Sequence, residues 1–285
     1  MKQILLDFWN FIKQPKDFRD TSGNKWRIFF TLFLAELSLL IVYVPIVYLI
    51  DNYIAVEEAV DLNLNIILSF LLLVLAIPFI EEVFFRLGLR RTGLVEIFFS
   101  EQQWKKYFPL FIYSSAIIFG LVHISNYANF SWLFILVSPV LILTQLVGGF
   151  ILSYLRVRFN FWIGFLYHAL WNFTAIFILG SIAMLFVNDI DIKTNDYELD
   201  IKHQSFVSLI DEKIITFQQT EEGNLQMIQS DEYSVKEMLE MVDVNFDNYI
   251  PESYIIELNF KSTNGISKDS LLILLQENDL IKKRR

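Results

Sequence analysis

Residues 64–86 read LNIILSFLLLVLAIPFIEEVFFR, an apolar run that ends in two glutamates and an arginine. A helix needs roughly 20 apolar residues to cross the hydrocarbon core of a bilayer, and this stretch supplies them. Each charged side chain in such a helix costs on the order of 2.5 to 3.5 kcal/mol on an insertion scale. The stretch therefore predicts a membrane-spanning helix whose charged residues have a function inside the membrane.

Four further stretches are long and apolar enough to span a bilayer: residues 26–50, 107–127, 130–155 and 160–187. Of the 285 residues, 54% are hydrophobic and 28 are phenylalanine, which is too apolar for an ordinary soluble domain. The predicted fold class is an all-α membrane bundle of about five transmembrane helices at residues 26–187, with the lipid bilayer as its surroundings.

The region before the bundle, residues 1–25, predicts an interfacial segment. One face of a helix there would carry four apolar side chains, Leu5, Phe8, Trp9 and Ile12. A frayed polar terminus is the alternative. The apolar run that follows begins too late and is too long for a cleavable signal peptide, so the first span is expected to act as a signal anchor.

The region after the bundle, residues 188–285, predicts a small soluble acidic α+β domain. It contains short alternating runs such as 197–202 and 254–260, and helix-like stretches near 234–242 and 267–279. A protein partner is a possible ligand of this domain.

Basic residues gather at one set of span ends. They lie before the first span, between the second and third, and between the fourth and fifth: Lys13, Lys16, Arg19, Lys25, Arg27, Arg90, Arg91, Lys105, Lys106, Arg156 and Arg158. The loop at residues 51–65 is acidic and has neither lysine nor arginine. The positive-inside rule then predicts a multi-pass protein of the plasma or inner membrane, with its N-terminus inside and its C-terminal domain outside.

Charge and cysteine content exclude several classes of function. Residues 188–285 carry 20 acidic and 10 basic side chains, so the net charge of -9 belongs to this region. Nothing forms the basic face that nucleic acid requires, and no nucleic acid partner is expected. The chain has no cysteine, which excludes a cysteine nucleophile, a thiolate metal site and disulfides.

The charged end of the second span contains two carboxylates with different neighbours. On a helix, Glu82 and Arg86 form an i, i+4 pair in the favourable order, whereas Glu81 points away from that pair. A carboxylate that stays unpaired beside another carboxylate suits a general base that activates water, so Glu81 is the candidate. The alternative is an interfacial charge cluster in which Arg86 reaches the lipid headgroups.

Two of the three histidines lie inside apolar spans. His123 follows Phe119 by one helical turn, and His168 precedes Asn172 by one turn. A single membrane histidine is more often a packing residue, but three helices here contribute a base, oxyanion donors and orienting groups. Hydrolysis by water requires these groups, and the sequence supplies them as Glu81, Glu82, Arg86, His123, His168 and Asn172.

The depths of these residues conflict if all helices are straight and start at one level. His123 lies about 25 Å beyond Lys106, whereas His168 lies only about 15 Å beyond Arg158, at the rise of an α-helix. We therefore expect a deeper start of the third span, a tilt or kink near Pro78 or Pro109, or a different topology.

Three motifs on successive spans resemble a known family. Glu-Glu-x-x-x-Arg, then Phe-x-x-x-His, then His-x-x-x-Asn is similar to the pattern of the CAAX protease and bacteriocin-processing family, also called CPBP or ABI, over residues 30–185. The family includes type II CAAX prenyl endopeptidases, which remove the last three residues of prenylated proteins. Many members have Gly directly after the motif arginine, whereas Leu87 precedes Gly88 here, which we expect to alter packing rather than chemistry.

The resemblance implies an intramembrane endopeptidase that acts on a hydrophobic or lipid-modified substrate. It implies that Glu81 activates water and His123 holds it, that His168 and Asn172 stabilise the oxyanion, and that Glu82 and Arg86 structure the site. It favours a metal-free mechanism, although Glu81, His123 and His168 are also a three-ligand set that could bind zinc. The His-Glu-x-x-His helix of soluble zinc proteases is absent.

Two other functions fit an intramembrane ionisable cluster. A transporter or proton relay uses such residues, although five spans without inverted repeats weaken this reading. A non-catalytic scaffold, whose outer domain recruits a partner protein, is the second alternative.

Overall fold

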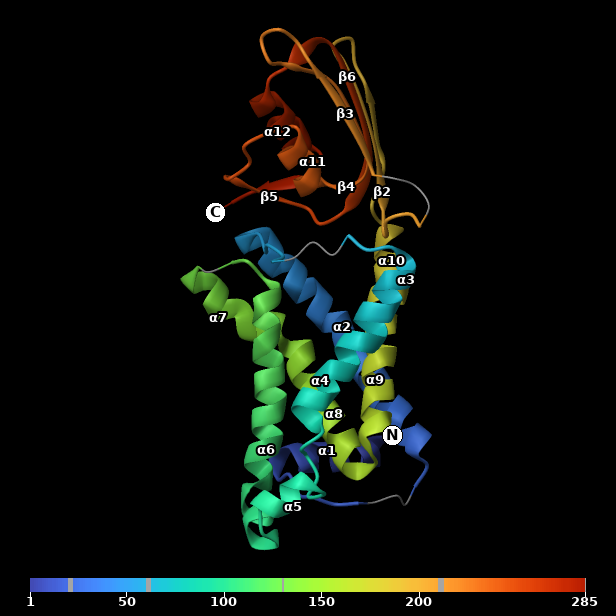
Figure 1. Cartoon of the computed structure of the whole chain (residues 1–285), viewed down its shortest axis with the longest axis vertical. Helices are drawn as coiled ribbons and strands as arrows, with labels where there is room; N and C mark the ends of the chain where they lie inside the picture. Colours follow the sequence, from blue (N-terminus) through green and yellow to red (C-terminus); the bar gives the residue numbers. More distant parts are fainter. Residues whose placement is uncertain (20–22, 60–62, 130, 210–212, 285) are drawn as a thin grey trace. The chain divides into compact units, whose positions relative to one another are not determined.

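The computed structural model describes residues 1–19, 23–59, 63–129, 131–209 and 213–284. The chain divides into two compact units, and each is described by itself. The first comprises Met1–Asn52 and Phe70–Thr174, and the second comprises Tyr53–Ser69 and Ala175–Arg285. Figure 1 shows that the first is built from helices and that the second contains a sheet.

The first unit contains ten helical segments among the described residues. They are α1 (Lys2–Lys13), α2 (Lys25–Ile54), the π-helix η1 (Phe70–Ala76), α4 (Ile77–Arg86), α5 (Leu94–Phe98), α6 (Glu101–Val122), the 3-10 helix η2 (His123–Asn126), α7 (Trp132–Leu141), α8 (Leu143–Arg158) and α9 (Phe161–Phe173). Helix α2 runs two residues past this unit, into the second.

Four helical runs are long and apolar enough to cross a membrane: Lys25–Ile54, Ile66–Arg86, Glu101–Asn126 and Phe161–Met184. The pair α7 and α8, which meet at an angle of 41°, would make a fifth. The described residues thus contain four to five candidate spans, compatible with the predicted bundle. The expected fourth span is broken rather than continuous.

The break between α7 and α8 has a local cause. Pro139 inside α7 lacks a backbone N–H and crowds the carbonyl one turn earlier, which disturbs the helix. Ile142 then leaves the helical conformation, at φ -99° and ψ 13°. The hydroxyl of Tyr43 on α2 donates a hydrogen bond to the carbonyl of Leu141. The neighbouring helix therefore satisfies a carbonyl that the break exposes.

Helix α8 forms the centre of the bundle. Its second half, from Ile151 to Arg158, is buried throughout. Two glycines allow α6 and α8 to approach closely: a Cβ at Gly149 would lie 3.1 Å from the Ala116 backbone, and one at Gly120 would collide with Leu146. Small residues at a helix contact are typical of membrane proteins.

The start of helix α6 explains how His123 and His168 come level although they lie at different distances from the ends of their spans. It begins at Glu101, six residues before the predicted start, where Ser100 and Gln103 form a capping box. Figure 1 shows its N-terminal end extending beyond the ends of α4 and α9. The third span therefore starts lower than its neighbours, and His123 at its far end reaches the level of the other site residues.

Helix α1 forms in the segment predicted to be interfacial, and one of its faces packs on the bundle. Phe8 and Phe11 make edge-to-face contacts with Tyr154 of α8, and Phe11 is the buried residue of the helix. Leu5 and Trp9 stay exposed. The segment is thus docked on the bundle rather than frayed.

The second unit contains a five-stranded antiparallel sheet in the order β1-β2-β6-β4-β3. Its strands are β1 (Ile190–Lys193), β2 (Tyr197–Gln204), β3 (Ile214–Gln219), β4 (Leu225–Ser234) and β6 (Ile255–Ile266). Strands β5 (Tyr249–Pro251) and β7 (Ile281–Lys283) pair separately. This unit also contains three short helical segments, α3 (Ile66–Ser69), η3 (Thr174–Leu179, from its second residue) and α10 (Gly180–Met184).

Two capped helices cover one face of this sheet. They are α11 (Val235–Met241), capped by Ser234, and α12 (Lys268–Glu277), capped by Ser267. Alternate strand residues such as Leu258 and Phe260 are fully buried in a shared core with both helices. The region after the bundle therefore has both helices and strands, as its alternating pattern predicted.

Candidate active site

The second span supplies a fully buried ion pair. Arg86 Nη1 lies 3.0 Å from Glu82 Oε1, and both side chains have no exposed surface. The Arg86 guanidinium also lies 3.8 Å from the ring centre of Phe119, as a cation–π contact. The spacing-based prediction of this pair is confirmed, and burial shows that Arg86 does not reach toward lipid headgroups.

His168 on α9 bridges the two carboxylates. Its Nδ1 lies 3.0 Å from Glu82 Oε1, and its Nε2 lies 3.4 Å from Glu81 Oε2. Glu82 is the ionised partner of Arg86 and can only accept a hydrogen bond, so Nδ1 is the donor. Nε2 is then the ring nitrogen that faces Glu81.

A glycine lets α9 close over this contact. A Cβ at Gly164, one turn before His168, would lie 3.3 Å from Glu82 Oε2. A larger residue at this position would push against the carboxylate that holds the ring of His168.

His123 approaches Glu81 from the other side. It stands where α6 gives way to η2, and its Nδ1 lies 2.7 Å from the carbonyl of Phe119. A carbonyl only accepts, so Nδ1 carries the hydrogen and Nε2 presents a lone pair. That Nε2 lies 3.9 Å from Glu81 Oε1. The ring of Phe119 contacts both imidazoles. Its centre lies 4.7 Å from the ring centre of His123 and 5.7 Å from that of His168.

The two adjacent carboxylates therefore differ in accessibility. The side chain of Glu81 is 21% exposed and faces an imidazole at each oxygen, whereas Glu82 is sealed. Of the six residues singled out in the sequence, the structure brings five into direct contact in one cluster: Glu81, Glu82, Arg86, His123 and His168.

Asn172, the sixth, lies one turn beyond His168 and has a backbone partner. Its Nδ2 donates a hydrogen bond of 2.8 Å to the carbonyl of Leu73 in η1. A π-helix displaces the regular hydrogen-bond ladder, and such segments are frequent at functional sites. One of the two amide hydrogens of Asn172 therefore binds the backbone of η1.

Glu36 is an intramembrane carboxylate that the sequence reasoning missed. It is buried on α2 and accepts a hydrogen bond of 2.6 Å from the hydroxyl of Tyr167, the residue before His168. A Cβ at Gly148 would lie 2.9 Å from its Oε1, so the glycine makes room for it. The signal was available, since an acidic residue in an apolar span is as costly in the first span as in the second.

Arginines assigned to loops prove to be structural. Arg156 is buried within α8, where it donates to the carbonyls of Arg86 and Leu87 at the end of α4. In the opposite direction, Arg90 donates hydrogen bonds to the carbonyls of Val157 and Phe159 at the end of α8. Cations favour helix C-termini, whose last carbonyls have no partner in the helix. The prediction that Arg156 and Arg158 lie in a loop was wrong, since both belong to α8.

The candidate zinc ligands Glu81, His123 and His168 do not form a metal site. Across the described residues, no three His, Asp or Glu side chains are placed so that they could hold a metal ion.

Four to five candidate spans around a cluster of carboxylates and imidazoles define a membrane protein with an ionisable site between its helices. Residues 63–174 match the family model described as Type II CAAX prenyl endopeptidase Rce1-like. This match supports the resemblance found in the sequence to CAAX-type intramembrane proteases, and the matched range contains all six candidate residues. No curated protein and no solved structure matches the chain.

Proposed function

We propose that this protein is an intramembrane endopeptidase that hydrolyses a peptide bond through water activated by Glu81. The observation that carries the proposal is the position of Glu81, whose partly exposed carboxylate faces the Nε2 atoms of His168 and His123 at 3.4 Å and 3.9 Å. Glu82 is unsuited to this role because it is buried and already bound to Arg86 and His168.

In this proposal the nucleophilic water binds beside both Glu81 and His123. Their facing atoms are 3.9 Å apart, which is too long for a direct hydrogen bond and invites a bridging water. Both atoms are acceptors, because the Nδ1 hydrogen of His123 is given to the Phe119 carbonyl. A water beside this gap donates one hydrogen to each, which leaves an oxygen lone pair free to attack a substrate carbonyl.

Bond breaking then proceeds in two steps. As the water oxygen bonds to the carbonyl carbon, Glu81 takes up its proton and a tetrahedral oxyanion forms. Nε2 of His168, when protonated, and the second amide hydrogen of Asn172 donate to that oxyanion. Collapse of the intermediate breaks the C–N bond, and the proton on Glu81 passes to the leaving amine.

The surroundings of Glu81 support a hydrophobic substrate. Ile77, Ile80 and Phe84 flank it on α4 and are 41%, 52% and 81% exposed. In a membrane, an apolar face of this kind contacts lipid, so a chain held in the bilayer can approach Glu81 from the side. A lipid-modified C-terminal peptide, such as a prenylated one, and an unmodified hydrophobic peptide are the two substrate types to compare.

The test is cleavage by the full chain in lipid nanodiscs, in water enriched in oxygen-18. Prenylated and unmodified hydrophobic peptide libraries are incubated with wild type, Glu81→Gln and the matched control Glu96→Gln on α5. We expect products with one labelled oxygen from wild type and Glu96→Gln but not from Glu81→Gln. If no peptide is cleaved while the protein carries a proton flux that Glu81→Gln abolishes, the relay alternative replaces the protease.

A further inference from the structure

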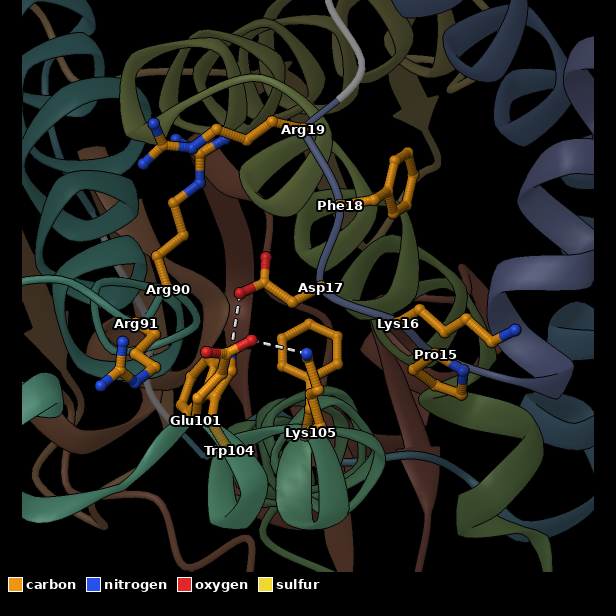
Figure 2. Close-up of a pocket in the computed structure, with 11 residues that line it drawn as sticks. Pro15, Lys16, Asp17, Phe18, Arg19, Arg90, Arg91, Glu101, Trp104 and Lys105 are labelled. Carbon is orange, nitrogen blue, oxygen red and sulfur yellow. Dashed lines mark hydrogen bonds and ion pairs between the residues drawn. The ribbon is translucent and has the colours of Figure 1, made fainter.

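A cavity of about 660 Å³ lies among helix ends far from the Glu81 cluster. It is lined by the segment after α1, the turn after α4 and the first turns of α6, and Figure 2 shows these side chains. Along α6, Trp104 in the cavity lies about 28 Å from His123 at the rise of an α-helix. The cavity is therefore separate from the candidate active site, and its volume is within the range of small-molecule sites.

Cations outnumber carboxylates among the side chains that line it. Five are basic and two acidic: Lys16, Arg19, Arg90, Arg91 and Lys105, with Asp17 and Glu101. Both acidic groups already have partners. Asp17 Oδ2 accepts a hydrogen bond of 2.7 Å from the indole of Trp104, and Glu101 lies 2.6 Å from Lys105. The cavity therefore has an excess of positive charge.

Two guanidinium groups lie together at one side of this space. Figure 2 shows the ends of Arg19 and Arg90 close together above Asp17. Burial, and next the positive charge of Arg19, lower the pKa of Arg90, while Asp17 opposes the shift. Arg90 is held in place by the carbonyls of Val157 and Phe159, so its charge is fixed in position. An anion placed between the two guanidiniums would relieve their repulsion.

The walls of the cavity indicate the kind of anion. The rings of Trp104 and Phe108 are almost fully buried, so the half-buried ring of Phe18 gives the cavity its accessible apolar side. The cavity lies at the ends of two candidate spans, where tryptophan and basic residues commonly meet lipid headgroups. Basic pockets between membrane helices are known sites for phosphorylated headgroups.

We propose that this cavity binds a phosphate-bearing anion, and that its occupant is the headgroup of an anionic phospholipid. The phosphate lies between Arg19 and Arg90, and the upper part of an acyl chain packs on the ring of Phe18. Lys105 adds a charge that can turn from Glu101 to the ligand.

The test compares two double variants of the full chain that lose the same charge. Arg19→Gln/Lys105→Gln alters the cavity, whereas Lys2→Gln/Lys106→Gln alters two exposed lysines outside it. Native mass spectrometry measures retention of phosphatidylglycerol against phosphatidylcholine, and thermal unfolding shows that each variant is folded. We expect wild type and the exposed-lysine variant to prefer phosphatidylglycerol, and the cavity variant to bind it at least about tenfold more weakly.

A second arm uses inorganic phosphate. Its binding to wild type, without a preference between the two lipids, would identify a soluble phosphate compound and overturn the lipid assignment. Equal retention of phosphatidylglycerol by both double variants, or loss in both, would overturn the site. Neither result bears on catalysis, because no residue altered here belongs to the Glu81 cluster.

Discussion

Replacing Glu82 by leucine leaves the Arg86 guanidinium as an unpaired charge in a fully buried position. The two groups lie 3.0 Å apart with no exposed surface, so water cannot take the place of the lost partner. Removing one member of a buried pair typically destabilises a protein by about 3 to 5 kcal/mol. We expect this loss for Glu82→Leu, and a similar loss for Arg86→Leu, which strands the carboxylate instead.

The double variant Glu82→Leu/Arg86→Leu separates stability from catalysis. Replacing both charges by apolar groups leaves no unpaired charge. We therefore expect the double variant to lose at least about 2 kcal/mol less unfolding free energy than the sum of the losses of the two single variants. Cleavage activity should not return, because the Nδ1 atom of His168 has lost the carboxylate that orients its ring.

The free energy of unfolding is measured in mixed micelles by denaturant titration, with tryptophan fluorescence as the signal. Glu101→Leu/Lys105→Leu, an exposed pair of the same spacing, is the control and should show little coupling. Additive losses in the buried pair, with coupling below about 0.5 kcal/mol, would refute the reasoning.

Three further predictions address other parts of the chain. Tyr167→Phe removes the hydrogen-bond donor to the buried Glu36 carboxylate and should lower the free energy of unfolding by about 1 to 3 kcal/mol. The control Tyr48→Phe, at an exposed position, should change it little. Equal losses in the two variants would contradict the hydrogen bond assigned to Tyr167. Burial lowers the pKa of His203 in β2 below its ordinary 6.5, an effect that Asp189 partly opposes, so its contribution to stability is present above pH 6.5 and is lost as pH falls below it. Hydrogen exchange in β2 of the full chain should therefore rise in wild type as the pH falls below 6.5. A His203→Gln variant that shows the same rise would contradict this. Exhaustive chelation should leave cleavage unchanged, whereas loss that zinc restores would show a metal-dependent reaction.

Short-range periodicity predicted the features that depend on a single helix. The Glu82–Arg86 pair follows from a spacing of four residues, and the position of Glu81 off that face follows from the same geometry. The extended start of α6 was also readable, because Ser100 and Gln103 have the spacing of a capping box. Hydropathy alone placed the start later, since the first turn of α6 is polar.

Contacts between helices were beyond such reasoning. The spacing along α9 gives no sign that His168 would bridge Glu81 and Glu82, nor that Asn172 would bind the carbonyl of Leu73. Arg156 has the sequence context of a loop cation, and only the packing of α8 against the end of α4 shows it to be buried. Which face of a helix meets which neighbour is decided by the whole bundle, and one sequence does not reveal it.

The rate constant kcat of Glu81→Gln, measured on one identified substrate, tests the central claim most directly. Glutamine keeps the shape of the side chain but cannot take a proton from water. General base catalysis contributes about 10² to 10⁴ in rate, so kcat should fall by that factor while KM and thermal stability change little. A Glu81→Gln protein that keeps kcat within about tenfold of wild type would contradict the assignment of Glu81 as the base.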